Sequence, residues 1–122
     1  MRRWVLAFLI TAGLAFAADF SGKWTGTLEA RNSPVPRSDG HFATLEQKGD
    51  KVTGVAGPKR DVQWPLASAQ VNGTKIDFIV EVPGGNLVMQ YSLELKDGEL
   101  SGIVVVKNRD GISWNLRLTR EP

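Results

Sequence analysis

TKIDFIVEVPGGNLVMQYSLELKDGELSGIVVV, residues 74–106, is the stretch that decides the fold of this chain. In residues 74–82, 87–96 and 99–107, apolar side chains recur at every second position with polar or charged ones between them. A period of two is the signature of a β-strand with one buried face. Two turn signals, at 83–86 and at Asp97-Gly98, separate the three segments. The stretch therefore predicts three antiparallel strands joined by two hairpins.

Five further segments extend the same pattern over the rest of the chain. They are residues 23–30, 41–48, 51–56, 61–71 and 112–120. The alternation is weakest in 41–48, because Phe42 and Leu45 fall on opposite faces. Pro65 interrupts 61–71, where we expect a bulge or a sheet edge, since proline cannot donate to a strand ladder. None of the eight segments has helical spacing, so the chain is predicted to be all-β.

Seven turns separate the eight segments, and short and long turns alternate. The short turns contain Gly49-Asp50, Asn72-Gly73 and Asp97-Gly98, and the long ones span 31–40, 57–60, 83–86 and 108–111. In an up-and-down sheet, successive turns lie at opposite ends, so all the long loops are expected at one rim. We predict an eight-stranded antiparallel up-and-down β-barrel, with a two-layer β-sandwich as the alternative. Inward-facing glycines in mid-strand favour the barrel, which must bend sharply there: Gly26, Gly54 and Gly102.

The first seventeen residues have the composition of a targeting segment. Arg2 and Arg3 precede an apolar run at 4–14, and Ala15-Phe16-Ala17 supplies small residues for cleavage. We expect residues 1–17 to be a signal peptide and 18–122 the mature barrel domain. The expected location is therefore secreted or periplasmic.

Charge and cysteine content exclude several classes of function. The whole chain has 15 basic and 13 acidic residues, and removal of Arg2 and Arg3 leaves 13 of each. A neutral domain has no general attraction to nucleic acid or anionic membranes. There is no cysteine, so neither a disulfide nor a lipid-acylated cysteine can form, and no stable membrane anchor is expected after signal cleavage.

Gly22-Lys23-Trp24 resembles the Gly-x-Trp signature of the calycin superfamily, the lipocalins and their relatives. The resemblance implies that Trp24 plugs the closed end of the barrel and that a basic residue from the last strand packs across it. Arg120 is the matching residue, because closing the barrel lays the end of the eighth segment beside the first. The second lipocalin signature, Thr-Asp-Tyr, is absent, and so is the C-terminal helix.

The residue types that catalysis needs are scarce. The chain has no cysteine and a single histidine, His41, so no nucleophile–base arrangement and no metal-ligand cluster can be argued. Asp77, Glu81 and Glu94 all fall on the outer face. We therefore predict a protein that is not an enzyme and that uses no cofactor and no metal. His41 is expected at the solvated rim.

The large side chains of the predicted lumen are candidate ligand contacts. Phe78, Met89, Tyr91 and Trp114 face inward on neighbouring segments, and Trp64 does so less regularly. An eight-stranded barrel either fills with its own side chains or holds one small ligand. In the second case Tyr91 would offer a hydroxyl and Met89 an adaptable wall.

Two binding functions are compatible with this pattern. The first is a carrier of a small hydrophobic or anionic-headed ligand. An acidic head group would meet the loop arginines Arg37, Arg60 and Arg109. The second is a solid-core, protein-binding barrel, such as a protease inhibitor or an envelope-assembly partner. It would use loop 31–40, where Ser33-Pro34-Val35-Pro36-Arg37 is stiffened by two prolines.

Overall fold

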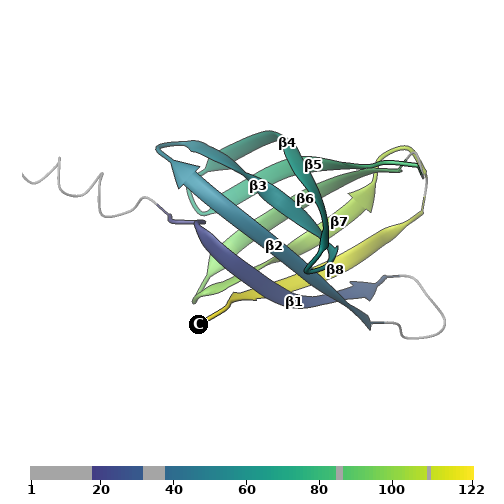
Figure 1. Ribbon diagram of the computed structural model, residues 1–122, viewed down its shortest axis with the longest axis horizontal. Helices are drawn as coiled ribbons and strands as arrows, with labels where there is room; N and C mark the ends of the chain where they lie inside the picture. The colour runs from purple at the N-terminus through teal and green to yellow at the C-terminus, as the bar shows by residue number, and fades with distance from the viewer. Residues whose placement is uncertain (1–17, 32–37, 85–86, 110) are drawn as a thin grey trace, which may run out of the picture.

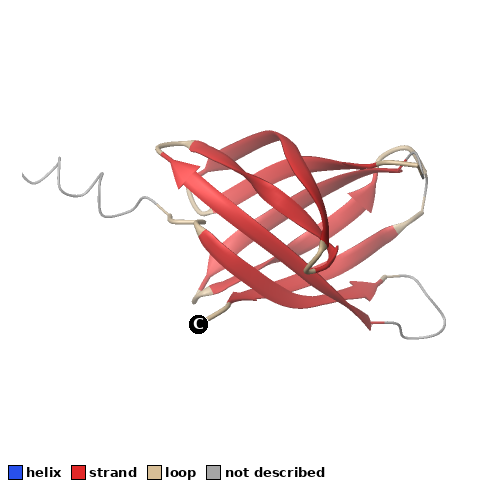
Figure 2. Ribbon diagram, in the orientation of Figure 1, coloured by secondary structure: helices blue, strands red, loops and turns tan. Residues whose placement is uncertain are grey.

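Eight antiparallel strands lie in sequence order around one closed barrel in the part of the chain that the structure describes (Figure 1). The structure is a computed structural model, and it describes residues 18–31, 38–84, 87–109 and 111–122. Within these ranges every regular element is a strand (Figure 2). The strands are β1 (Gly22–Ala30), β2 (Ser38–Lys48), β3 (Lys51–Lys59), β4 (Val62–Asn72), β5 (Lys75–Val82), β6 (Leu87–Lys96), β7 (Glu99–Val106) and β8 (Ser113–Arg120).

The barrel closes along a ladder between β1 and β8. The two strands pair antiparallel from Trp24 opposite Arg120 to Ala30 opposite Trp114. The predicted barrel is therefore confirmed, and the two-layer sandwich is excluded. Closure pairs the first edge strand with the last one, so every strand has two hydrogen-bonded neighbours.

Glycines in mid-strand permit neighbouring backbones to approach closely. A Cβ atom on Gly26 would lie 1.7 Å from the carbonyl oxygen of Arg117 on β8, and one on Gly102 would lie 2.0 Å from that of Ser92 on β6. No side chain fits at these distances. The predicted role of these glycines in barrel closure is consistent with this geometry.

The tight turns join the strands at the end where β1 begins. Asp97 and Gly98, between β6 and β7, both have positive φ (54° and 79°), as a type I′ hairpin requires. At the β2–β3 and β4–β5 turns, only the first central residue has positive φ, namely Gly49 and Gly73, each at 65°. That pattern is typical of a type II′ turn, which places glycine first.

The β3–β4 connection is shorter than the sequence predicted. Residues 57–59 belong to β3, and Lys59 pairs with Val62, so Arg60 and Asp61 alone make the turn. The irregularity expected at Pro65 lies on both sides of it instead. Pro65 pairs with Val55, while the register shifts between Ala56 and Lys59 and again between Ala67 and Gln70.

The closed half of the barrel holds a packed apolar core. Its fully buried members come from segments far apart in the sequence and include Phe20, Trp24, Ile76, Leu100, Leu116 and Leu118. The alternation of β5 to β8 correctly predicted most of this core. Ile112 is the exception, because it precedes β8 and is 38% exposed.

The signal peptide expected at residues 1–17 lies outside the described residues. Among the residues that are described, no helix has the length and apolar character needed to span a membrane.

Candidate ligand-binding cavity

The closed end of the barrel is sealed around Trp24. The Trp24 side chain is fully buried, and its indole Nε1 donates a hydrogen bond of 3.0 Å to the carbonyl oxygen of Phe20. The guanidinium carbon of Arg120 lies 4.6 Å from the centroid of the Trp24 ring. The predicted cation–π contact is therefore confirmed.

Backbone groups before β1 hold Arg120 in place over the ring. Its Nε donates to the carbonyl oxygen of Ser21 at 3.1 Å, and its Nη2 donates to that of Asp19. A Cβ atom added to Gly22 would lie only 3.3 Å from the Arg120 Nε, so a bare backbone suits this position. The pKa of Asp19 is lowered, chiefly by the backbone N–H of Ser21 and in smaller part by the charge of Arg120.

The opposite, open half of the barrel contains a cavity of about 420 Å³. The volume lies within the range typical of small-molecule sites. Seven strands contribute lining residues, and most of these are apolar. The lining consists of Leu28, Asp39, Gly40, His41, Pro58, Lys59, Trp64, Val82, Leu87, Met89, Tyr91 and Trp114.

Four of the five aromatic and methionine side chains predicted in the lumen meet in this cavity. Trp64, Met89, Tyr91 and Trp114 all line it. Phe78, the fifth, is buried beside Tyr91, and the two rings stack with centroids 4.5 Å apart and planes 18° apart. Phe78 therefore supports the wall rather than lining it.

His41 lies inside the barrel, so the prediction that it lies at the solvated rim is wrong. Its side chain is 3% exposed, and its Nε2 lies 2.7 Å from the hydroxyl oxygen of Tyr91. Burial lowers the pKa of His41 from 6.5 to about 4, and burial raises the pKa of Tyr91. Both groups are therefore neutral at pH 7. We refer to the hydrogen-bonded pair as the His41–Tyr91 dyad.

The alternation of buried side chains along β2 was the sequence signal that could have placed His41 in the lumen. His41, Ala43 and Leu45 alternate and are all buried, whereas Phe42 faces outward and is only half-buried. Counting every second residue back from Leu45 puts His41 on the same inward face. Phe42 obscured that assignment, because an outward phenylalanine is unusual unless something covers it.

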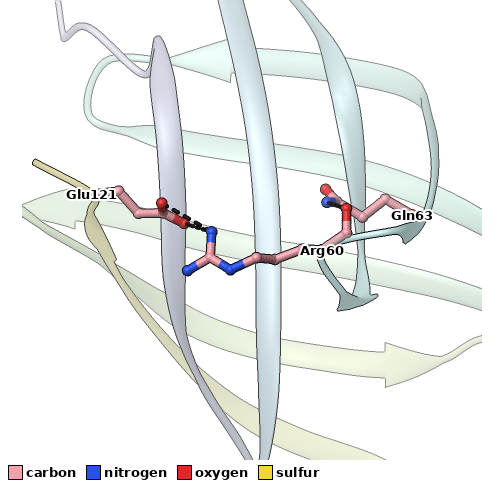
Figure 3. Close-up of polar contacts among 3 residues, drawn as sticks. All are labelled: Arg60, Gln63 and Glu121. Atoms are coloured by element: carbon pink, nitrogen blue, oxygen red, sulfur yellow. Dashed lines mark hydrogen bonds and ion pairs between the residues drawn. The ribbon is translucent and has the colours of Figure 1, made fainter.

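Arg60 covers Phe42. Its guanidinium carbon lies 4.8 Å from the centroid of the Phe42 ring, and its Nη1 contacts both carboxylate oxygens of Glu121 at 3.0 and 2.8 Å. Figure 3 shows the Arg60 side chain reaching over a neighbouring strand toward Glu121, with Gln63 donating to the Arg60 carbonyl oxygen. Arg60 thus binds the outer wall, and the prediction that it faces the mouth is wrong.

Of the other two arginines predicted at the mouth, Arg109 lies in the described part of the chain and Arg37 does not. Arg109 is exposed between β7 and β8 and is absent from the lining. Arg37 lies outside the described residues, as does most of the proline-containing loop proposed to bind a protein. Lys59 and Asp39 line the cavity and bring opposite charges to it.

A larger hollow, of about 490 Å³, lies on the outside of the rim. It is lined in part by Glu81 and Val88, whose neighbours Val80 and Met89 face the lumen. The lining of this hollow includes the polar side chains of Glu81 and Asn108, whereas the 420 Å³ cavity has a mostly apolar lining from seven strands. The 420 Å³ cavity is the better candidate site.

The described residues contain no group of three or more histidine, cysteine or acidic side chains that could hold a metal ion. Comparison with known proteins identifies neither a matching family model nor a matching curated protein. The closed eight-stranded antiparallel barrel is compatible with a calycin-like fold.

Proposed function

We propose that this protein is a lipocalin-like binding protein, secreted or periplasmic and without enzymatic activity, that carries a small hydrophobic ligand in the mouth of its barrel. The observation that carries the proposal is the division of the lumen. The half around Trp24 is filled by side chains and sealed by Arg120, while the other half contains the 420 Å³ cavity. A solid-core barrel would have no such space.

The chemistry of the cavity wall supports a largely apolar ligand. Two tryptophans and a methionine supply large, polarisable contact surfaces, and aliphatic side chains complete the wall. Arg60 is bound to Glu121. Among the described residues that line the cavity, the charged side chains are one base, Lys59, and one acid, Asp39, so the described lining has no excess of positive charge. The cavity therefore favours the hydrophobic ligand over the anionic-headed one.

Two adjacent β6 residues provide a matched test. Leu87 lines the cavity, while Val88 faces outward next to it. N-phenyl-1-naphthylamine, a neutral apolar dye, is titrated into the protein and its fluorescence is recorded. We expect the dye to bind, Leu87→Trp to weaken binding at least tenfold by filling the cavity, and Val88→Trp to change it less than twofold. Absence of dye binding, or equal effects of the two variants, would contradict the proposal.

A further inference from the structure

The lining of the cavity contains one polar arrangement that an apolar carrier does not need. His41 and Tyr91 are 3% and 1% exposed, and each is the hydrogen-bond partner of the other. The Nδ1 atom of His41 is buried and has no hydrogen-bond partner among the described residues. A buried polar atom without a partner costs about 1–3 kcal/mol of stability, so its presence requires an explanation.

The hydrogen bond within the dyad can run in either direction. When the Tyr91 hydroxyl donates to Nε2, His41 carries its proton on Nδ1, and that N–H has no acceptor. When Nε2–H donates to the Tyr91 oxygen, Nδ1 is a vacant acceptor and the Tyr91 proton is unused. In both tautomers the dyad keeps one unused donor and one unused acceptor, and it carries no charge.

Rigid packing fixes the position of this polar pair. Tyr91 stacks on Phe78 at 4.5 Å, and the His41 ring lies 5.7 Å from the Tyr91 ring. The cavity also contains Trp64, Met89 and Trp114, all on its wall. The site thus combines aromatic surfaces with a fixed, neutral hydrogen-bonding group.

We propose that the His41–Tyr91 dyad selects a neutral aromatic ligand that carries one hydroxyl or carbonyl group, which completes the hydrogen bonding of the dyad. This inference rests on the proposed function and adds the chemical class of the ligand. A hydroxyl suits both tautomers, because it can donate to or accept from the dyad. A carboxylate fits less well, since Lys59 is balanced by Asp39 at the cavity and the dyad offers no positive charge.

Three probes with one ring system test this selectivity: 2-naphthol, 2-methylnaphthalene and 2-naphthoate. Each is titrated against the protein with bound N-phenyl-1-naphthylamine, and the displacement gives its Kd. The decisive quantity is the ratio of the Kd of 2-methylnaphthalene to that of 2-naphthol. Comparing this ratio between the protein and a variant cancels the difference in hydrophobicity of the two probes.

Tyr91→Phe and His41→Gln each disturb the dyad, and Tyr91→Phe keeps the ring that stacks on Phe78. We expect either substitution to lower the ratio about threefold to tenfold, the equivalent of one net hydrogen bond. Met89→Leu is the control, because it alters the wall without touching the dyad. It is expected to change both affinities together and to leave the ratio within twofold.

The possible outcomes separate this inference from the proposed function. If neither the dye nor any of the probes binds, the carrier proposal itself is wrong. If the neutral probes bind but the ratio is the same in the protein and in both dyad variants, the cavity stands and the selectivity is refuted. Tightest binding by 2-naphthoate would also overturn the inference, in favour of an anionic ligand.

Discussion

Arg120, the last residue of β8, lies across the ring of Trp24 on β1, with its guanidinium carbon 4.6 Å from the ring centroid. The two residues are also backbone partners in the ladder that closes the barrel. One contact therefore joins the two ends of the fold and covers the bottom of the lumen. Removing this contact is therefore expected to weaken both the ladder that closes the barrel and the packing around Trp24.

Replacement of Arg120 tests the contribution of this contact to stability. Arg120→Ala removes a cation–π interaction, worth about 0.5–2 kcal/mol, and two hydrogen bonds to backbone carbonyls. We expect the free energy of unfolding, measured by urea denaturation, to fall by about 2 kcal/mol. Arg109→Ala, an exposed loop substitution, should change it by less than about 0.5 kcal/mol. Similar values for the two variants would show that Arg120 does not seal the barrel.

Gly26 tests the close approach of β1 to β8. A methyl group there would overlap the Arg117 carbonyl oxygen, 1.7 Å away. Gly26→Ala is expected to destabilise the fold by about 3 kcal/mol or more, since the strands must separate. Gly40→Ala is the matched control, because its new methyl would meet only the Phe42 ring, at an ordinary 3.8 Å. Thermal unfolding of both variants by circular dichroism distinguishes them, and a tolerated Gly26→Ala would refute the geometry.

Burial of His41 predicts a specific dependence of stability on pH. The pKa of His41 is about 4 in the folded protein, against an ordinary value of 6.5 for the unfolded chain. Between these two pH values, His41 is therefore protonated in the unfolded chain and neutral in the folded protein. The contribution of His41 to the free energy of unfolding is fully present above pH 6.5. It decreases as the pH falls toward 4, by about 3 kcal/mol in total.

Urea denaturation at intervals from pH 7.5 to pH 4 measures this loss. His41→Gln keeps a hydrogen-bonding group beside Tyr91 but does not titrate, so its stability should be nearly flat over the same range. Asp19, whose pKa is lowered, has its effect below its ordinary value of 3.8 and outside this window. Parallel curves for the protein and the variant would mean that His41 is not buried in the neutral form.

The Arg60–Glu121 ion pair is expected to contribute little to stability. Its side chains are 65% and 21% exposed, so solvent screens their attraction. A double-mutant cycle with Arg60→Ala and Glu121→Gln should give a coupling of about 0.5 kcal/mol that disappears in 1 M NaCl. A coupling above about 2 kcal/mol would show that the outer wall depends on this pair.

Local chemistry in the sequence predicted the fold well from β5 to β8. Alternating side chains such as Ile76, Phe78 and Val80 assign the inward face, and Asp97-Gly98 fixes the hairpin between β6 and β7. Both signals depend on neighbours in the chain. The contact of Arg120 with Trp24 was also predicted, because closure of an eight-stranded meander lays the end of the last strand beside the start of the first, and the Gly-x-Trp resemblance implies a basic residue at that place.

The candidate site was harder to predict, because it depends on long-range placement. Phe42 gave β2 an ambiguous pattern, since its partner Arg60 lies eighteen positions away in the chain and on another hairpin. Without that partner, His41 could not be assigned to the lumen. The presence of a cavity could not be predicted either, because it depends on how completely the inward side chains of all eight strands fill the lumen of the barrel.

Closure through β1 and β8 has a consequence for the order of folding. The residues that meet at this ladder, 24–30 and 114–120, are almost the whole domain apart in sequence. A chain that is still being synthesised therefore keeps two unpaired sheet edges until its final segment is available, and such edges favour pairing with other chains. A partner that shields nascent strands would be needed most during that interval, and the finished protein would no longer require it.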